Sequence, residues 1–312
     1  MDERPGRGDP MMRVSNPPEW ERYPLRTAEL CAGYGGLSLS IGDKHPTWVS
    51  EIDPHASRVL RDRFPYSPNL GDMTLIDWAS AQSVDVLVGG TPCQDLPLAG
   101  RRAGMSPETR SGLWSHMYRA AEELNPNVVI WENVAGARTS PRSGGMPALV
   151  RVVTDLAGLG YVALWDYVRA SDAGAPHRRE RVFVLAFRPA ASGALRVLLD
   201  RTGETRFRGT EPTDPNSPSH DPRLGAFGVR LRLWESITGN PMPEPEEDSP
   251  RGGRRLSARF GEWMMGLPPG WVTGFRSIPR TAQIRILENG VVPQQGSRAI
   301  HSLAQRGLEV LL

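Results

Sequence analysis

The sequence predicts an α/β fold, with a doubly wound, mostly parallel sheet and a small loop-rich region attached to it. Between residues 25 and 188, short apolar runs alternate with longer stretches whose apolar residues recur at helical spacing. Strands that alternate with helices in this way favour a mostly parallel sheet covered on both faces. Residues 189–254 have a different composition, since they hold nine prolines and eight glycines. We therefore expect little regular structure in that segment.

Each element follows from a run of residues in the sequence. Apolar runs predict strands at 26–31, 48–51, 84–89, 128–132, 161–169 and 181–187. Helical spacing predicts helices at 36–42, 55–64, 113–124 and 148–159. Regular patterning returns from residue 255, continues through 260–267 and ends in a predicted C-terminal helix near 298–311. The expected organisation is a proline-rich disordered arm (1–24), a first domain (25–188), a loop-rich second domain (189–254) and a C-terminal segment that returns to the first domain (255–312).

Composition excludes several classes of protein. No apolar run approaches the roughly 18 residues that a membrane helix needs, and residues 1–10 lack the apolar stretch of a secretory signal. Two cysteines, Cys31 and Cys93, cannot build a disulfide framework, and a metal cluster would need more ligands. We therefore expect a cytoplasmic protein without a metal site.

The charge of the chain is nearly balanced but its basic residues are unusual. Among 37 basic and 35 acidic residues, only Lys44 is a lysine. A genome rich in G and C explains an arginine bias, and so does selection for a planar donor fork that suits phosphate and guanine. Composition does not separate these explanations. The basic surplus lies in 170–188 and 255–312, which flank the loop-rich segment.

Three turns in succession suit a nucleoside-type cofactor. The first predicted strand runs into Cys31-Ala32-Gly33-Tyr34-Gly35-Gly36, where glycines let a ligand approach the backbone. The second ends in Glu51-Ile52, and a carboxylate there can accept hydrogen bonds from ribose hydroxyls. A third turn carries Asp72, which suits an adenine amino group. Any one of these is only a tight turn by itself, whereas three in order favour the cofactor.

A thiol and a carboxyl group follow two later strands. Cys93 comes after Gly90-Thr91-Pro92 at the end of a buried strand, where active sites form in open α/β sheets, although a buried structural cysteine is the alternative. Glu132 ends the next strand, at the same edge of the sheet. A nucleophilic thiol and a proton donor form a pair for attack on an electrophilic ring.

Two arginine-rich stretches complete the pattern. The glycine-hinged segment 95–112, with Arg101, Arg102 and Arg110, could close over a polyanion or be a solvated loop. In 176–181, strand alternation would send Arg179 and Arg181 to one face, and a surface ion-pair cluster is the alternative.

Taken in order, these motifs resemble those of the DNA cytosine-C5 methyltransferases. The resemblance spans roughly 25–312 and rests on the glycine turn at 33–36, Pro92-Cys93-Gln94, Glu132-Asn133-Val134, Arg179-Glu180-Arg181 and the closing stretch 289–293. It implies a Rossmann-like methyltransferase sheet in 25–188 and a target-recognition region in 189–254, in which Arg206, Arg208, Arg230 and Arg232 are candidate base readers.

The resemblance also implies an enzyme that transfers methyl groups from S-adenosylmethionine to cytosine flipped out of duplex DNA. Cys93 would add to C6 of the base, Glu132 would hold N3 and the exocyclic amine, Arg181 would contact O2, and Arg179 would support the nucleophile. The implied cofactor residues are Cys31, Ala32, Gly33, Gly35, Gly36, Glu51 on ribose, Ile52, Asp72 on adenine, Pro92, Asn289 and Val291. The implied context is a bacterial or phage-infected cell, with a monomer that can accompany a cognate restriction endonuclease.

Four residues depart from the family's pattern. Cys31 stands where phenylalanine is usual, His177 where glutamine is usual, Pro97 where serine is common and Glu288 where glycine precedes Asn289. Cys31 and Glu288 keep open a non-catalytic DNA-binding relative of the same fold. A transfer RNA cytosine-C5 methyltransferase is the third alternative.

Overall fold

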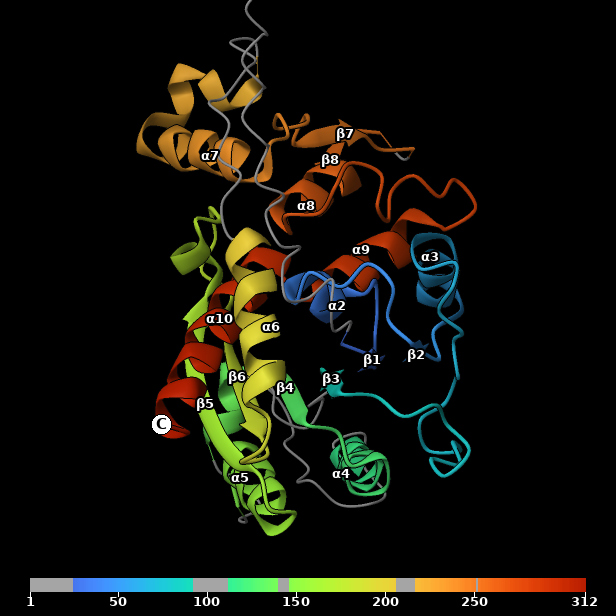
Figure 1. Cartoon of the computed structure of the whole chain (residues 1–312). Coiled ribbons are helices and arrows are strands. Elements are labelled where there is room, and N and C mark those ends of the chain that lie inside the picture. Colours follow the sequence, from blue (N-terminus) through green and yellow to red (C-terminus); the bar gives the residue numbers. More distant parts are fainter. Residues whose placement is uncertain (1–24, 92–111, 140–145, 206–216, 251) are drawn as a thin grey trace, which may run out of the picture.

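A six-stranded sheet forms the centre of the protein (Figure 1). The structure, a computed structural model, describes residues 25–91, 112–139, 146–205, 217–250 and 252–312, so the N-terminal arm lies outside it. Within the described residues the strand order is β2-β1-β3-β4-β6-β5. The strands are β1 (Thr27–Leu30), β2 (Trp48–Ser50), β3 (Val86–Gly89), β4 (Val128–Val134), β5 (Val162–Arg169) and β6 (Glu180–Phe187).

The sheet is mostly parallel, as the sequence predicts. Strands β2, β1, β3 and β4 pair in parallel, and β6 runs antiparallel to both of its neighbours, β4 and β5. All four residues of β3 and the first six of β4 are buried. Continuous apolar runs of this kind are typical of parallel strands that are covered on both faces.

Helices cover the two faces of the sheet. On one face, α4 (Leu113–Leu124) and α5 (Ala148–Gly158) pack against alternate strand residues that include Trp131 and Val184. On the other face, α2 (Gly36–Ser40), α6 (Ser192–Thr205) and α10 (Pro293–Val310) pack against Ile130 and Leu185. The doubly wound α/β prediction is therefore confirmed, and α10 begins five residues earlier than the helix expected near 298.

The expectation of little regular structure in 189–254 is wrong. The segment holds α6 and a second 14-residue helix, α7 (Gly225–Thr238). Both helices form because they bury apolar residues at helical spacing: Leu195 and Leu198 on α6, and Leu231 and Trp234 on α7. Helix α6 packs with α10 against one face of the sheet, so it is part of the helical layer that covers the sheet. The predicted domain boundaries stay a prediction.

A third apolar cluster lies beyond the carboxyl ends of the parallel strands. It joins Trp234 of α7 to Trp263, Ile286 and Tyr34, so it links the small region to the first turn of the sheet. The remaining α-helices and strands are α3 (Pro54–Arg63), β7 (Glu246–Asp248), β8 (Arg254–Leu256), α8 (Ala258–Met264) and α9 (Arg280–Asn289). In the part of the chain that the structure describes, no helix is long and apolar enough to cross a membrane.

Candidate active site

The turn after β1 has an unusual backbone held by a carboxylate. Cys31, Gly33 and Gly35 all have positive φ angles, of 52°, 57° and 85°. A non-glycine residue rarely adopts this conformation, at a cost on the order of 1 kcal/mol. Glu51, at the end of β2, accepts hydrogen bonds from the backbone N–H of Gly33 at 2.8 Å and of Asp53 at 2.7 Å. The carboxylate thereby fixes the first two turns relative to each other.

A buried glutamate supports this turn from below. Glu29 of β1 accepts hydrogen bonds from the backbone N–H of Leu37 at 3.1 Å and from the N–H and hydroxyl of Ser38 at 2.8 and 2.6 Å. These N–H groups belong to the first turn of α2, where a helix leaves its donors unpaired. Burial raises the pKa of Glu29 to about 7, against the opposing effect of these hydrogen bonds.

Tyr34 joins the glycine turn to the last motif. Its hydroxyl donates a hydrogen bond to the carbonyl of Val291 at 2.6 Å, and its ring is fully buried. A Cβ on Gly290 would lie 1.9 Å from the ring, and a Cβ on Gly36 would lie 2.9 Å from the Val291 carbonyl oxygen. Trp271 donates its indole N–H to the carbonyl of Tyr34 at 2.9 Å. Two segments far apart in the sequence therefore close on each other around this residue.

An ion pair lies at the carboxyl end of β4. Nε of Arg181 is 3.1 Å from Oε1 of Glu132, and both side chains are largely buried. Burial raises the pKa of Glu132, and the positive charges of Arg181 and Arg179 oppose that rise. A Cβ on Gly90 would lie 3.1 Å from the other carboxyl oxygen of Glu132, so Gly90 leaves that oxygen uncrowded.

The strand before Cys93 is tied to the strand of Glu132. The carbonyl of Thr91 accepts a hydrogen bond from the side-chain amide of Asn133 at 2.8 Å, and its hydroxyl accepts one from the indole of Trp131 at 2.8 Å. Thr91 is the last residue described before the predicted nucleophile. Cys93 itself lies outside the described residues, as do Pro92, Pro97, Arg101, Arg102, Arg110, Arg206 and Arg208.

Arg179, two residues before Arg181, contacts the last motif. Its Nη2 donates to the carbonyls of Glu288 at 2.8 Å and Gly290 at 2.5 Å. The side-chain amide of Gln295 in turn donates to the carbonyl of Arg179 at 2.8 Å. The side chain of Glu288 is exposed, so the residue that departs from the family's glycine contributes its backbone here.

The other candidate cofactor residues lie around the same edge of the sheet. Ile52 follows Glu51 and is 71% exposed, and Ala32 is buried beneath the turn. Half-buried Asp72 accepts a hydrogen bond from the N–H of Thr74 at 2.9 Å. Asn289 ends α9 and is exposed. These placements leave the carboxylates of Glu51 and Asp72 and the apolar side chain of Ile52 on neighbouring turns.

Two of the unusual residues have structural contacts. Sγ of Cys31 lies 3.6 Å from Sδ of Met73, and burial together with neighbouring carboxylates raises the pKa of the Cys31 thiol to about 12, which disfavours the thiolate form. A ring nitrogen of His177 lies 3.0 Å from the carbonyl of Met264. Among the described residues, no group of three or more His, Cys, Asp and Glu side chains is arranged to hold a metal ion.

The family model of C-5 cytosine-specific DNA methylases matches residues 25–208, which is more than half of the chain. The chain belongs to this family. The matched range contains the glycine turn, the turn after β3, the β4 carboxylate, Arg179 and Arg181. The resemblance inferred from the ordered motifs is thus confirmed.

Type II methyltransferases are among the relatives of this family member. It is 34% identical over 165 residues to M.Eco47II of Escherichia coli, a match that covers 51% of this chain and 39% of the relative. It is 31% identical over 170 residues to M.DsaV of Dactylococcopsis salina, covering 54% of this chain and 47% of the relative. The matched part therefore spans less than half the length of these relatives.

Two solved structures share the fold of this family member. A prophage-encoded E. coli protein assigned as a DNA modification methyltransferase has a TM-score of 0.58 and 19% identity, covering 92% of this chain and 99% of the other. The Dnmt2 methyltransferase of S. pombe has a TM-score of 0.59 and 15% identity, with the same coverage. At these identities the likeness concerns the fold.

Sequence reasoning missed several residues that hold the site together. Glu29 had a visible signal, because an acidic residue inside an apolar strand must be paired or neutral. Tyr34, Trp271 and Gln295 had no comparable signal, since each acts on a segment more than one hundred residues away. Their roles follow from tertiary packing.

Proposed function

We propose that the protein is a DNA (cytosine-5-)-methyltransferase that methylates cytosine at C5 in a specific sequence of double-stranded DNA. The observation that carries this proposal is the buried pair of Glu132 on β4 and Arg181 on β6, because β4 is also tied to Thr91, two residues before Cys93 in the sequence. A carboxyl group and a guanidinium at one sheet edge present the donors and acceptors that a pyrimidine needs. Membership of the cytosine-specific family supports the same base.

S-adenosylmethionine is the proposed cofactor, and the residues present fit it. The Glu51 carboxylate suits ribose hydroxyls, Asp72 suits the adenine amine and exposed Ile52 suits the face of the base. A Cβ at Gly33 would meet nothing within 4 Å, so the turn leaves open space for the cofactor's methionine part. Asn289 and Val291 close the pocket in this proposal, beside Cys31, Ala32, Gly35, Gly36 and Pro92. Once bound, the cofactor supplies an electrophilic methyl group.

The chain's own residues act on the flipped cytosine. The thiolate of Cys93 adds to C6, which makes C5 nucleophilic. Glu132 bonds N3 and the exocyclic amine, and its raised pKa favours a carboxyl proton at N3, where it offsets the charge that develops on the ring. Arg181, held by Glu132, reaches O2 of the base. Arg179 supports the last motif through its hydrogen bond to the carbonyl of Gly290. Once C5 carries the methyl group, loss of the C5 proton to solvent and breaking of the C6–S bond restore the double bond of the base and free the Cys93 thiolate.

Transfer of labelled methyl groups to duplex DNA tests this proposal. Wild type should label the DNA, Cys93→Ser should not, and Glu132→Gln should lose activity while it still binds DNA. Bisulfite sequencing of DNA from expressing cells then identifies the target sequence. Methylation by Cys93→Ser at the wild-type rate would refute the mechanism.

The alternatives and the cellular context are open to simple measurements. Calorimetry without any heat of binding at millimolar S-adenosylmethionine would favour a non-catalytic DNA-binding relative. Faster turnover on transfer RNA than on duplex DNA would favour an RNA methyltransferase. We further propose that the enzyme is monomeric and cytoplasmic. We also propose that it acts in a bacterial or phage-infected cell and can accompany a cognate restriction endonuclease, because named Type II relatives come from bacteria and from a Chlorella virus.

A further inference from the structure

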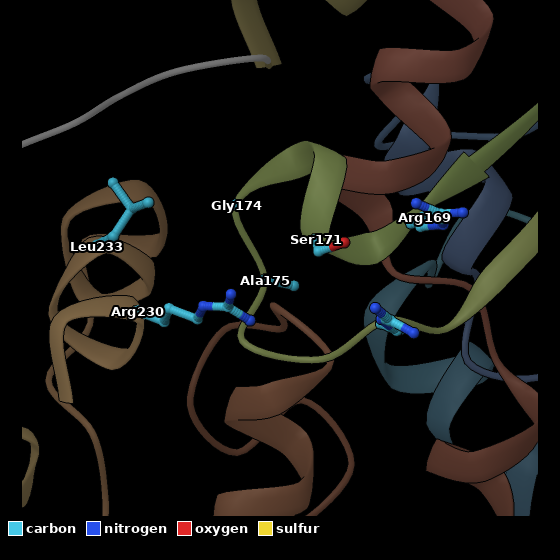
Figure 2. A pocket seen from close by; sticks show the side chains of 7 residues that line it. Arg169, Ser171, Gly174, Ala175, Arg230 and Leu233 are labelled. Atoms are coloured by element: carbon cyan, nitrogen blue, oxygen red, sulfur yellow. The ribbon is translucent and has the colours of Figure 1, made fainter. Parts of the chain in front are cut away.

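A basic pocket lies between α7 and the carboxyl end of β5, away from the ion pair of Glu132. Its volume is about 340 Å³. Figure 2 shows Arg230 pointing from α7 toward the loop at Ala175, with Arg169 on the opposite side. The lining residues are Arg169, Ser171, Gly174, Ala175, Arg178, Arg230 and Leu233.

The charge of the pocket is positive. Three arginines line it, from β5, from the segment before β6 and from α7, and none of the lining residues is acidic. Arg169 is paired with Glu180 at 3.2 Å. Within the described residues, neither Arg178 nor Arg230 is in an ion pair, and both are exposed. Two full positive charges therefore face a small hollow, an arrangement that attracts an anion.

Packing and backbone hydrogen bonds fix the walls of the pocket. The carbonyl of Arg178 accepts a hydrogen bond from the N–H of Ala170 at 3.0 Å, which holds the segment before β6 against the end of β5. Gly174 has a φ of 89°, and a Cβ there would lie 2.1 Å from Cδ1 of Ile237 on α7. Helix α7 thus approaches the loop as closely as a glycine allows, which sets the position of Arg230.

The pocket lies at the same edge of the sheet as the proposed base site. In the register of the sheet, Arg181 pairs with Val134 of β4 on one side and with Val168 of β5 on the other. Arg169 follows Val168, so the pocket begins about two strand spacings, or roughly 10 Å, from the strand of Glu132. Arg179 serves the last motif and Arg181 serves Glu132, whereas Glu180 pairs with Arg169 and Arg178 lines the pocket.

We propose that this pocket binds a phosphodiester group of the duplex DNA backbone, held between Arg178 of the catalytic layer and Arg230 of α7. The proposal rests on the proposed function, because it places the strand that carries the target cytosine. Guanidinium groups suit phosphate oxygens, and Ser171 adds a hydroxyl donor. Such a contact fixes the position of the DNA and carries no sequence information.

Salt-dependent binding of duplex oligonucleotides to the full chain tests the pocket. Arg178→Gln and Arg230→Gln should each weaken binding about tenfold at roughly 0.1 M salt, on target and non-target duplexes alike. Each should lower the slope of log Kd against log salt by up to about one, and the double variant should lower it by no more than about one, because both arginines hold the same phosphate. Arg306→Gln, an exposed arginine near the end of α10, removes the same charge and should leave the slope unchanged.

The outcomes separate this pocket from the proposed reaction. If both variants keep the wild-type slope and affinity, the phosphate site is wrong, even where wild type methylates DNA. A loss confined to the target sequence would also overturn it, because Arg230 would then read a base. Unchanged urea midpoints of unfolding would show that the variants are folded. The test also remains valid if the wild type does not methylate DNA, because binding is measured without turnover.

Discussion

Replacement of Gly290 by alanine tests how tightly the glycine turn fits the last motif. The new Cβ would lie 1.9 Å from Cε1 and 2.3 Å from Cζ of Tyr34, whereas ordinary contact begins at 3.4 Å. The ring must therefore move by about 1.5 Å, which is too far for a fully packed interior to absorb without strain. The φ of Gly290 is −81°, which alanine adopts without strain, so the whole effect is steric.

The cost follows from what holds the ring. Tyr34 is fully buried and donates a 2.6 Å hydrogen bond to Val291, which a displacement of this size breaks. Loss of that bond costs about 1 kcal/mol, and an overpacked core costs about 1–3 kcal/mol. We expect Gly290→Ala to lower the free energy of unfolding by about 2–4 kcal/mol.

Urea unfolding followed by circular dichroism measures this change. Gly261→Ala in α8 is the matched control, because its Cβ would meet Leu287 and Ile284 at 3.7 and 3.8 Å, which is ordinary contact. Alanine inside a helix should raise the free energy of unfolding by about 0.5–1 kcal/mol. A Gly290→Ala protein with the wild-type midpoint and the same slope would refute the tight fit around Tyr34.

Three further changes have defined outcomes. Burial raises the pKa of Glu29 from 4.5 to about 7, so between these pH values the unfolded state releases a proton that the folded state keeps. The wild type should therefore lose about 3 kcal/mol of stability as the pH rises through this range. Urea midpoints of Glu29→Gln should lack this loss, and equal pH profiles of the two proteins would contradict the prediction. Glu262 accepts hydrogen bonds from the backbone N–H groups of Gly270, Val272 and Thr273. In Glu262→Gln, the side-chain NH2 group would face one of these donors, so the change should lower the free energy of unfolding in urea by about 2 kcal/mol. A wild-type midpoint would show that the segment 270–273 is held by other contacts. Gly174→Ala should lower the free energy of unfolding by about 1–3 kcal/mol in the same assay. Adding Ile237→Val to this variant removes the overlapping Cδ1 and should recover part of the loss. No recovery would assign the cost to the positive φ of residue 174.

The middle strands of the sheet were predictable because they are buried on both faces. Runs such as 86–88 and 128–131 are continuous in apolar residues, and the structure places β3 and β4 at these runs. The failure in 189–254 has a physical reason. The proline and glycine content is an average over the whole segment, whereas each of these helices depends on a window of 14 residues. The windows of α6 and α7 carry proper apolar spacing between proline-rich stretches.

The candidate site was predictable only in its residue types. Glu132 and the arginines around the start of β6, Arg179 and Arg181, could be identified as chemistry-bearing residues from their place at strand ends. Which of them meet depends on strand order, and the sequence does not state that β6 lies between β4 and β5. The contact of Tyr34 with Val291 joins residues 257 positions apart, and no local pattern indicates such a pair.

The antiparallel direction of β6 explains how one short run serves several sites. In a parallel strand, the residue near the active edge would be the last one, Phe187, and the polar start of β6 would lie at the opposite edge. Because β6 is reversed, its beginning lies beside the carboxyl ends of β4 and β5. Strand alternation then divides the run: Arg179 holds the last motif and Arg181 holds Glu132, while Glu180 pairs with Arg169. A one-residue shift of β6 would exchange these faces and break all three contacts together.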